Sequence, residues 1–374
     1  MSEDDVTQVR PLTETDRRIP SLDGLRALSI GCVILGHLSG TRGFPSLIAA
    51  VFANDYLDLA NIGVRVFFVI SGFLITGLLL AEHAKGGAIS LSRFYLRRSL
   101  RIFPAYYAYL LVVALLAATR VIVVRGSDFV HALTYTMNYA PSRGWHLGHL
   151  WSLAVEEQFY LLWPAALVFA TPHRAWRLAL GVVCIVPIAR LMEGVFWYSS
   201  LAHIGTFEST ADAIALGCLL ALWRDRLWNH GWYRRAVESH WIAPLLLVVG
   251  LTVSLRFRPG LLLGTPMVNA ALTLGIDRVV RHPNGFLGRV LNAKPLVFVG
   301  TLSYSIYLWQ QLFLNRASDS PAAAFPLNIL LAACVAPLSY FLIERPFLML
   351  RPRMEKAWIR PSVVKASVEQ ATSL

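Results

Sequence analysis

Ten stretches of mostly apolar residues, spread along the 374-residue chain, constrain its fold more than any other feature. A helix that crosses the hydrocarbon core of a bilayer needs about 20 such residues. The stretches lie near 22–40, 60–81, 103–124, 150–170, 178–198, 211–224, 241–257, 261–280, 295–314 and 324–344. The sequence therefore predicts an all-α fold, a polytopic membrane helical bundle with about ten transmembrane helices.

The amino-acid composition agrees with lipid as the solvent. Hydrophobic residues make up 56% of the chain and charged residues 15%, whereas a soluble domain carries about 25% charged residues. The four cysteines lie inside apolar runs, far from one another in sequence, and no HExxH motif occurs. We therefore predict no metal site and no bound cofactor.

The net charge of +12 is explained by topology. Lys and Arg gather in the short segments between apolar stretches, as they do in cytoplasmic loops. With ten spans, all of these clusters fall on one side of the membrane and both termini are cytoplasmic. Because the basic residues are accounted for by cytoplasmic loops, we predict no nucleic-acid partner. The clustered residues are Arg10, Arg17, Arg18, Arg93, Arg97, Arg98, Arg101, Arg174, Arg177, Arg224, Arg226, Arg234, Arg235, Arg278, Arg281, Arg289, Lys294, Arg351, Arg353 and Lys356.

The chain divides into two tails and one membrane domain. Residues 1–20 are polar and lack the apolar core of a signal peptide, so we expect a disordered cytoplasmic tail. Residues 21–350 form the membrane domain, and 351–374 a cytoplasmic C-terminal tail. The semi-polar, aromatic stretch 125–149 is left outside the membrane or re-entrant. Irregular backbone at membrane depth is tolerated where it lines a wet cavity, so this stretch is a candidate wall or lid of a site.

The first apolar stretch contains Arg26 and His37, eleven residues apart. Eleven helical steps return to within about 20° of the same face and cover roughly 16 Å. A charged side chain at this depth costs on the order of 3 kcal/mol, which favours a functional role. His37 could instead mediate helix pairing, and Arg26 could be a snorkelling anchor paired with Asp23.

Two further pairs of ionisable residues are candidates for chemistry. Arg98 and Arg101 share a helix face, and arginines so placed can hold phosphates of a donor such as acyl-CoA. A topological or lipid-headgroup role is the alternative. Glu156 and Glu157 are adjacent near the start of the fourth stretch. One of them could orient a catalytic histidine, which we place at the same level, while the arginines stay at the other end.

Several polar and aromatic residues near these positions are candidate cavity-lining residues. Arg65 could also be an anchor, and Ser71 with Gly72 could simply let helices approach closely. No GxSxG elbow supports Ser71 as a nucleophile. The candidates are Arg65, Ser71, His146, His149 and Trp151.

The last apolar stretch ends in the sequence IERP. Glu344 and Arg345 are placed to pair with each other at the cytoplasmic edge. Pro346 is expected to end the helix, because proline lacks the backbone N–H that the next turn needs.

These segments together resemble the acyltransferase-3 family of membrane enzymes. The motifs are the Arg26–His37 spacing, VFFVISGFLI at 66–75, FYLRRSLRIFPAY at 94–106, WSLAVEEQFYLLWP at 151–164, GTLSYSIYLWQ at 300–310 and IERP at 343–346. The family implies transfer of an acyl group, commonly from acyl-CoA, to a hydroxyl. Some members carry a fused soluble hydrolase domain of the SGNH type, and we expect none here.

The resemblance also implies residue roles. His37 matches the family's essential histidine, Arg26 the arginine of the same motif, Arg98 and Arg101 its RxxR pair, and Glu156 and Glu157 its acidic catalytic pair, of which either could act. From the topology we expect Arg98, Arg101 and Arg26 to be donor-binding residues. We expect an O-acyltransferase of the cell (inner) membrane, with acyl-CoA as co-substrate and a sugar, glycan or glycosylated natural product as acceptor. A small-molecule permease is the rival interpretation, although no internal symmetry supports it. A membrane scaffold would not need the arginine and carboxylate pairs.

Overall fold

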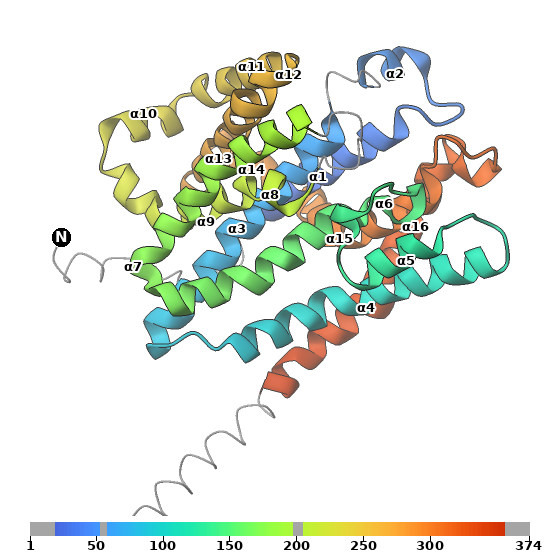
Figure 1. Ribbon diagram of the computed structural model, residues 1–374, viewed down its shortest axis with the longest axis horizontal. Helices are drawn as coiled ribbons and strands as arrows, with labels where there is room; N and C mark the ends of the chain where they lie inside the picture. Colours follow the sequence, from blue (N-terminus) through green and yellow to red (C-terminus); the bar gives the residue numbers. More distant parts are fainter. Residues whose placement is uncertain (1–18, 53–57, 197–204, 356–374) are drawn as a thin grey trace, which may run out of the picture.

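The computed structural model describes residues 19–52, 58–196 and 205–355, and within them all regular structure is helical (Figure 1). The elements are α1 (Pro20–Leu38), α2 (Ser46–Phe52), α3 (Leu59–Gly86), α4 (Leu91–Ala118), α5 (Gly126–Leu133), η3 (Met137–Tyr139), α6 (Trp145–Gly148), α7 (Leu150–Phe196), α8 (Phe207–Thr210), α9 (Asp212–Trp228), α10 (Gly231–Glu238), α11 (Ile242–Ser254), α12 (Phe257–Pro259), η5 (Gly260–Gly264), α13 (Thr265–Arg281), α14 (Phe286–Leu291), α15 (Lys294–Phe313), η6 (Pro321–Ala323), α16 (Leu327–Ser339) and η7 (Tyr340–Glu344). The predicted all-α bundle is confirmed. The predicted tails 1–20 and 351–374 fall mostly outside the described residues.

Seven helical segments of the described residues are long and apolar enough to cross a membrane, or eight if the bent pair α10 and α11 forms one span. The protein is therefore a multi-pass membrane protein. Three predicted spans, 211–224, 241–257 and 295–314, correspond to α9 with 17 residues, α11 with 13 and α15 with 20, which are outside the seven. The count of about ten and the cytoplasmic position of the termini stay predictions.

The predicted span 150–170 and the described part of the predicted span 178–198 both lie in α7, a helix of 47 residues. Figure 1 shows α7 as two limbs that meet at an angle. The first limb falls within the segment Trp145–Ala170, which also includes α6, and the second falls within Arg174–Phe196. The sequence has proline at position 172, between the limbs. Because proline cannot donate the next helical hydrogen bond, it favours a bend at this place.

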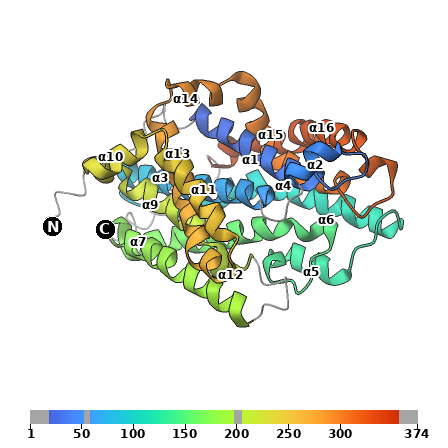
Figure 2. The same cartoon turned by 90° about the horizontal axis from the view of Figure 1, so that it is seen from above.

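Helices α1 and α3 form the middle of the bundle. They contact each other, α1 packs on α15, and α3 packs on α9 (Figure 2). The contact between α3 and α9 is close because it is made by glycines. A Cβ added to Gly72 of α3 would collide with the carbonyl oxygen of Ile214, and one on Gly217 of α9 with that of Val69. The role in close packing expected for Gly72 is confirmed.

Replacing Gly72 by valine should therefore push α3 and α9 apart. We expect a lower midpoint of thermal unfolding in detergent, because over-packing costs about 1–3 kcal/mol. A matched control is Gly31→Ala, since a Cβ there meets no atom within 4 Å. Equal midpoints for the two variants would contradict this account of the α3–α9 contact.

The C-terminal helix continues through Pro346, so the prediction that this proline ends it is wrong. Helical structure extends from Leu327 to Glu355. The turn just before the proline is the π-turn η7, in which one extra residue widens the helix. A wider turn accommodates a residue that lacks an N–H and would collide with the preceding turn. The π-turn η5 is likewise followed two residues later by a proline, Pro266.

Candidate active site

Many of the polar residues inside the bundle line two adjoining cavities. The first, here called the arginine cavity, has a volume of about 90 Å³. The second, the histidine cavity, has about 350 Å³, within the ~300–1,000 Å³ of typical small-molecule sites. Residues of the arginine cavity include Arg26, Ser71, Arg98, Arg101, Glu156 and Tyr160. Those of the histidine cavity include His37, Asp58, Asn61, Trp145, His149 and Trp151.

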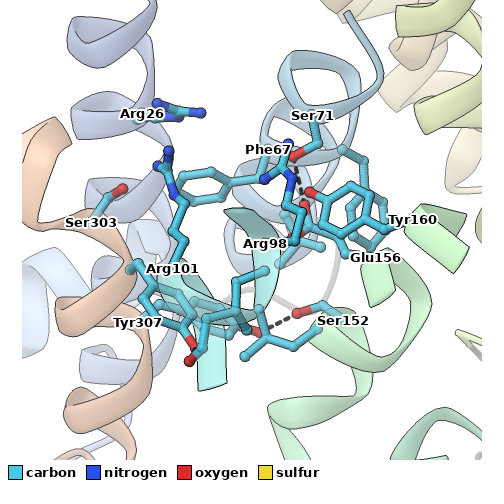
Figure 3. Close-up of a pocket in the computed structure, with 15 residues that line it drawn as sticks. Arg26, Phe67, Ser71, Arg98, Arg101, Ser152, Glu156, Tyr160, Ser303 and Tyr307 are labelled. Carbon is cyan, nitrogen blue, oxygen red and sulfur yellow. Dashed lines mark hydrogen bonds between the residues drawn. The ribbon is translucent and has the colours of Figure 1, made fainter. Parts of the chain in front are cut away.

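Three arginines from two helices converge on the arginine cavity (Figure 3). Arg26 of α1 forms an ion pair with Asp23 at 3.2 Å. The Arg98 guanidinium of α4 lies over the Tyr160 ring, 4.5 Å from its centroid. Arg101 lines the same cavity and interacts electrostatically with both other arginines. So much positive charge around one narrow space is suited to a bound anion.

The adjacent carboxylates Glu156 and Glu157 face different surroundings, because neighbouring helical residues are about 100° apart. The Ser71 hydroxyl donates a hydrogen bond to Glu156 Oε1 at 2.8 Å, and both residues line the arginine cavity. Glu157 instead lies near a tyrosine cluster that includes Tyr106 and Tyr135. Among the described residues, its buried Oε1 has no hydrogen-bond partner. Glu156 is thus the member of the pair that reaches a cavity.

His37 does not meet the acidic pair, and this geometric prediction is wrong. Its ring packs edge-on against Trp145, with centroids 5.6 Å apart, in the cavity next to the one that Glu156 lines. The reason lies in α7, which passes the histidine cavity at its first residues. Glu156 is five residues beyond Trp151, about 7.5 Å further along the helix. The carboxylate that shares a cavity with His37 is Asp58, which precedes α3.

A chain of side-chain amides takes the place of the expected carboxylate. Gln311 Nε2 donates to the backbone oxygen of Trp145 at 2.8 Å, and Gln310 Nε2 donates to Gln311 Oε1 at 2.8 Å. Gln310 Oε1 is therefore the acceptor for His37 Nδ1, 3.0 Å away. Because the backbone carbonyl of Trp145 can only accept a hydrogen bond, the donor and acceptor of every hydrogen bond in this series are fixed. Nδ1 carries the proton of the neutral ring, and Nε2 is left with a lone pair.

The backbone at His37 is held by a cation from another segment. The Arg316 guanidinium donates to the carbonyl oxygens of His37, at 3.2 Å, and of Gly36. These carbonyls belong to the last turn of α1, where a positive charge is favourable. His37 is thus fixed through both its ring and its main chain.

The segment 125–149 forms a wall of the histidine cavity, as predicted. Arg143, Gly144, Trp145, Gly148 and His149 line it. The segment is tied to α4 by tyrosines, since Tyr106 donates to Ala132 O at 2.8 Å and Tyr109 to His146 O at 2.6 Å.

The remaining predicted cavity residues divide into two groups. Ser71 lines the arginine cavity, and His149 and Trp151 line the histidine cavity. Arg65 and His146 line neither of the two. Arg65 donates to Asn61 Oδ1 at 2.7 Å and Asn269 Oδ1 at 3.2 Å, and lies 3.9 Å from Asp212. Arg65 therefore belongs to a buried network between α3, α9 and α13.

Sequence reasoning missed Asp58 and Gln310, and it gave Glu344 the wrong partner. Gln310 is fully buried within an apolar stretch, and a polar side chain at that depth is a usable signal. Glu344 is 4% exposed and accepts from the Ser305 hydroxyl. It does not form the expected pair with Arg345, which lies over the Phe341 ring. Glu344 instead contributes negative charge near Arg101.

The fold and the two cavities define a multi-pass membrane protein that keeps arginines and a histidine inside its helical bundle. A family model described as an acyltransferase domain matches residues 19–343, and the chain belongs to this acyltransferase-3 family.

Two relatives from bacteria illustrate the similarity. The chain is 29% identical to the O-acetyltransferase OatA of Staphylococcus aureus over 369 residues, which covers 88% of this chain and 57% of the relative. It is 30% identical to the putative peptidoglycan O-acetyltransferase YrhL of Bacillus subtilis over 373 residues, or 89% and 55% of the two chains. The chain thus spans little more than half the length of these relatives. No solved structure matches it.

Proposed function

We propose that the protein is an O-acyltransferase that moves an acyl group, specifically acetyl, from acyl-CoA to a hydroxyl of a sugar or glycan. The observation that carries the proposal is the pair of adjoining cavities, one lined by arginines and one by His37. An acyltransferase with a charged donor must bind two substrates with different chemistry and bring them together. Family membership and the names of the relatives support the same reaction.

The arginine cavity is the proposed donor site. The phosphates of acyl-CoA carry several negative charges, and Arg98, Arg101 and Arg26 offer guanidinium forks that match phosphate oxygens. Glu156 lies among these arginines, so we assign it to holding them in place rather than to chemistry at His37. The thioester end of the donor then extends from this cavity toward the histidine cavity.

The histidine cavity is the proposed acceptor site. It combines the indole rings of Trp145 and Trp151 with the polar groups of Asp58 and Asn61. Aromatic surface with a few placed hydrogen-bonding groups is suited to a sugar ring and its hydroxyls. YrhL is named for peptidoglycan, which supports a glycan as the acceptor here.

The proposed step uses His37 as a general base. The Nε2 lone pair takes the proton of the acceptor hydroxyl while its oxygen attacks the thioester carbonyl. The C–O bond of the ester forms, the C–S bond breaks, and the proton passes from His37 to the leaving thiolate, which leaves as free CoA thiol. A transient acyl-histidine, formed at the same nitrogen, is the variant of this scheme.

We further propose that the arginine cavity opens toward the cytoplasm of a bacterial cell, in its inner membrane, with both chain termini on that side. The basic segments of the sequence support this orientation. Acyl-CoA would then bind from the cytoplasm while the acceptor binds from the other side.

The test of the proposed function is release of free thiol from acetyl-CoA by membranes that contain the protein, with a panel of sugar and glycan acceptors. Thiol release that requires an acceptor is the expected result. If correctly inserted protein releases no thiol from any acyl-CoA but moves a solute across the membrane of vesicles, the proposal is wrong and the permease alternative takes its place.

A further inference from the structure

The two cavities lie end to end along the bundle, and three helices show this by the order of their residues. On α3, Asn61 lines the histidine cavity and Ser71 the arginine cavity, with Val64 between them. On α7, Trp151 lines the former and Glu156 the latter. On α1 the arginine cavity comes first along the chain, at Arg26, and the histidine cavity second, at His37. The order is reversed because α1 runs in the opposite direction to α3 and α7. The arginines and His37 therefore lie in two adjoining cavities that follow each other along the bundle.

The two cavities have a defined junction. Among the described residues that line the two cavities, Val64 and Tyr307 belong to both. Each is only 6% exposed, so the passage between the cavities is bordered by these two side chains. We call this pair the window.

The two sides of the window differ in rigidity. The Tyr307 hydroxyl donates to the His149 carbonyl oxygen, 2.7 Å away. It also lies 2.6 Å from Ser152 Oγ (Figure 3). Its ring packs against that of His149, with centroids 5.4 Å apart. Two hydrogen bonds and a ring contact fix Tyr307. Val64 has no polar group that could form a hydrogen bond. Its methyl groups therefore determine how wide the window is on the side opposite Tyr307.

The proposed reaction places the thioester in this window. The donor phosphates lie at the arginines, and the attacking hydroxyl must lie within hydrogen-bonding reach of His37. The thioester carbonyl must approach that hydroxyl to within about 3–3.5 Å. The acyl carbon therefore has to reach the boundary between the cavities, and the window is that boundary.

We infer that Val64 and Tyr307 form an acyl-selecting window, in which the side chain of Val64 sets the size of the acyl group that is transferred. This inference rests on the proposed function. It specifies that the protein selects the acyl group of the donor, and it assigns this selection to Val64 and Tyr307.

The experiment compares kcat/KM for acetyl-, propionyl- and butyryl-CoA in the wild type, Val64→Ala, Val64→Phe and Val69→Ala. The last variant is a matched control, because Val69 lies on the same helix, is 0% exposed and lines neither cavity. Each selectivity ratio is measured within one variant, so it does not depend on how much of that variant is folded.

Val64→Ala is expected to raise the butyryl-to-acetyl ratio about tenfold, since one methylene in a fitted pocket changes selectivity by about 10–200-fold. Val64→Phe should lower acetyl transfer at least tenfold, with an unchanged elution profile in detergent, and Val69→Ala should keep the wild-type ratio. If the wild type transfers acetyl, but Val64→Ala and Val69→Ala have the same butyryl-to-acetyl ratio, the window inference is wrong and the proposed function still stands. A wild type that releases no thiol from any acyl-CoA overturns the proposed function and the window together.

Discussion

Replacement of His37 by alanine is expected to lower acceptor-dependent thiol release by about 10²–10⁴-fold, the usual contribution of a positioned general base. The amide chain through Gln310 and Gln311 leaves Nε2 free to take a proton, and alanine has no group that can replace it. The measurement is kcat at saturating acetyl-CoA and acceptor, together with KM for the donor. Because the donor phosphates are assigned to the other cavity, the donor KM should change little.

His146→Ala is the matched control for this prediction. His146 is a histidine of the neighbouring segment that lines neither of the two cavities, so its loss should leave kcat within a few-fold of the wild type. A His37→Ala protein that keeps full activity would contradict the general-base scheme and the acyl-histidine variant alike.

Replacement of Arg98 or Arg101 by alanine is expected to raise the KM for acyl-CoA about 10–100-fold for each change. Hydrogen bonds to charged groups contribute about 1.5–3 kcal/mol, and about 1.4 kcal/mol corresponds to a factor of ten. Lysine at either position should restore part of the affinity, since it keeps the charge but loses the planar fork. The measurement is initial rate against acyl-CoA concentration at a fixed, saturating acceptor concentration.

Arg97→Ala is the control for the donor site. Arg97 is on the same helix, but it pairs with Glu355 at 2.8 and 3.1 Å and does not line the arginine cavity. Its loss should leave the donor KM unchanged. An unchanged donor KM in the Arg98 and Arg101 variants would show that the anion-binding assignment of the arginine cavity is wrong.

The helical bundle could be predicted from the sequence because a long apolar run has few alternatives in lipid. The number of spans stays a prediction where helices are short or interrupted. Helix α11 has 13 residues and is bent by 81° relative to α10, and such a break depends on tertiary contacts. The continuation of the last helix past Pro346 was missed because a π-turn has no simple sequence signal.

The sequence predicted several of the ionisable residues that line the two cavities, but not how they are grouped. His37, Arg26, Arg98 and Arg101 stand out because charge in an apolar stretch is costly. The separation of Glu156 from His37 depends on how α7 lies against α1, which spacing within one helix cannot give. The partner of His37 was unpredictable for the same reason, since Gln310 is 273 positions away in sequence.

The π-turn η7 has a consequence for the rotational phase of the helix that follows it. One extra residue per turn rotates every later side chain by about 100° relative to an uninterrupted α-helix. With this rotation, Glu355 faces Arg97 and joins the end of the chain's last described helix to α4. Deleting a single residue within Tyr340–Glu344 would reset the phase, so that Glu355 turns away from Arg97 although no residue of that ion pair has changed.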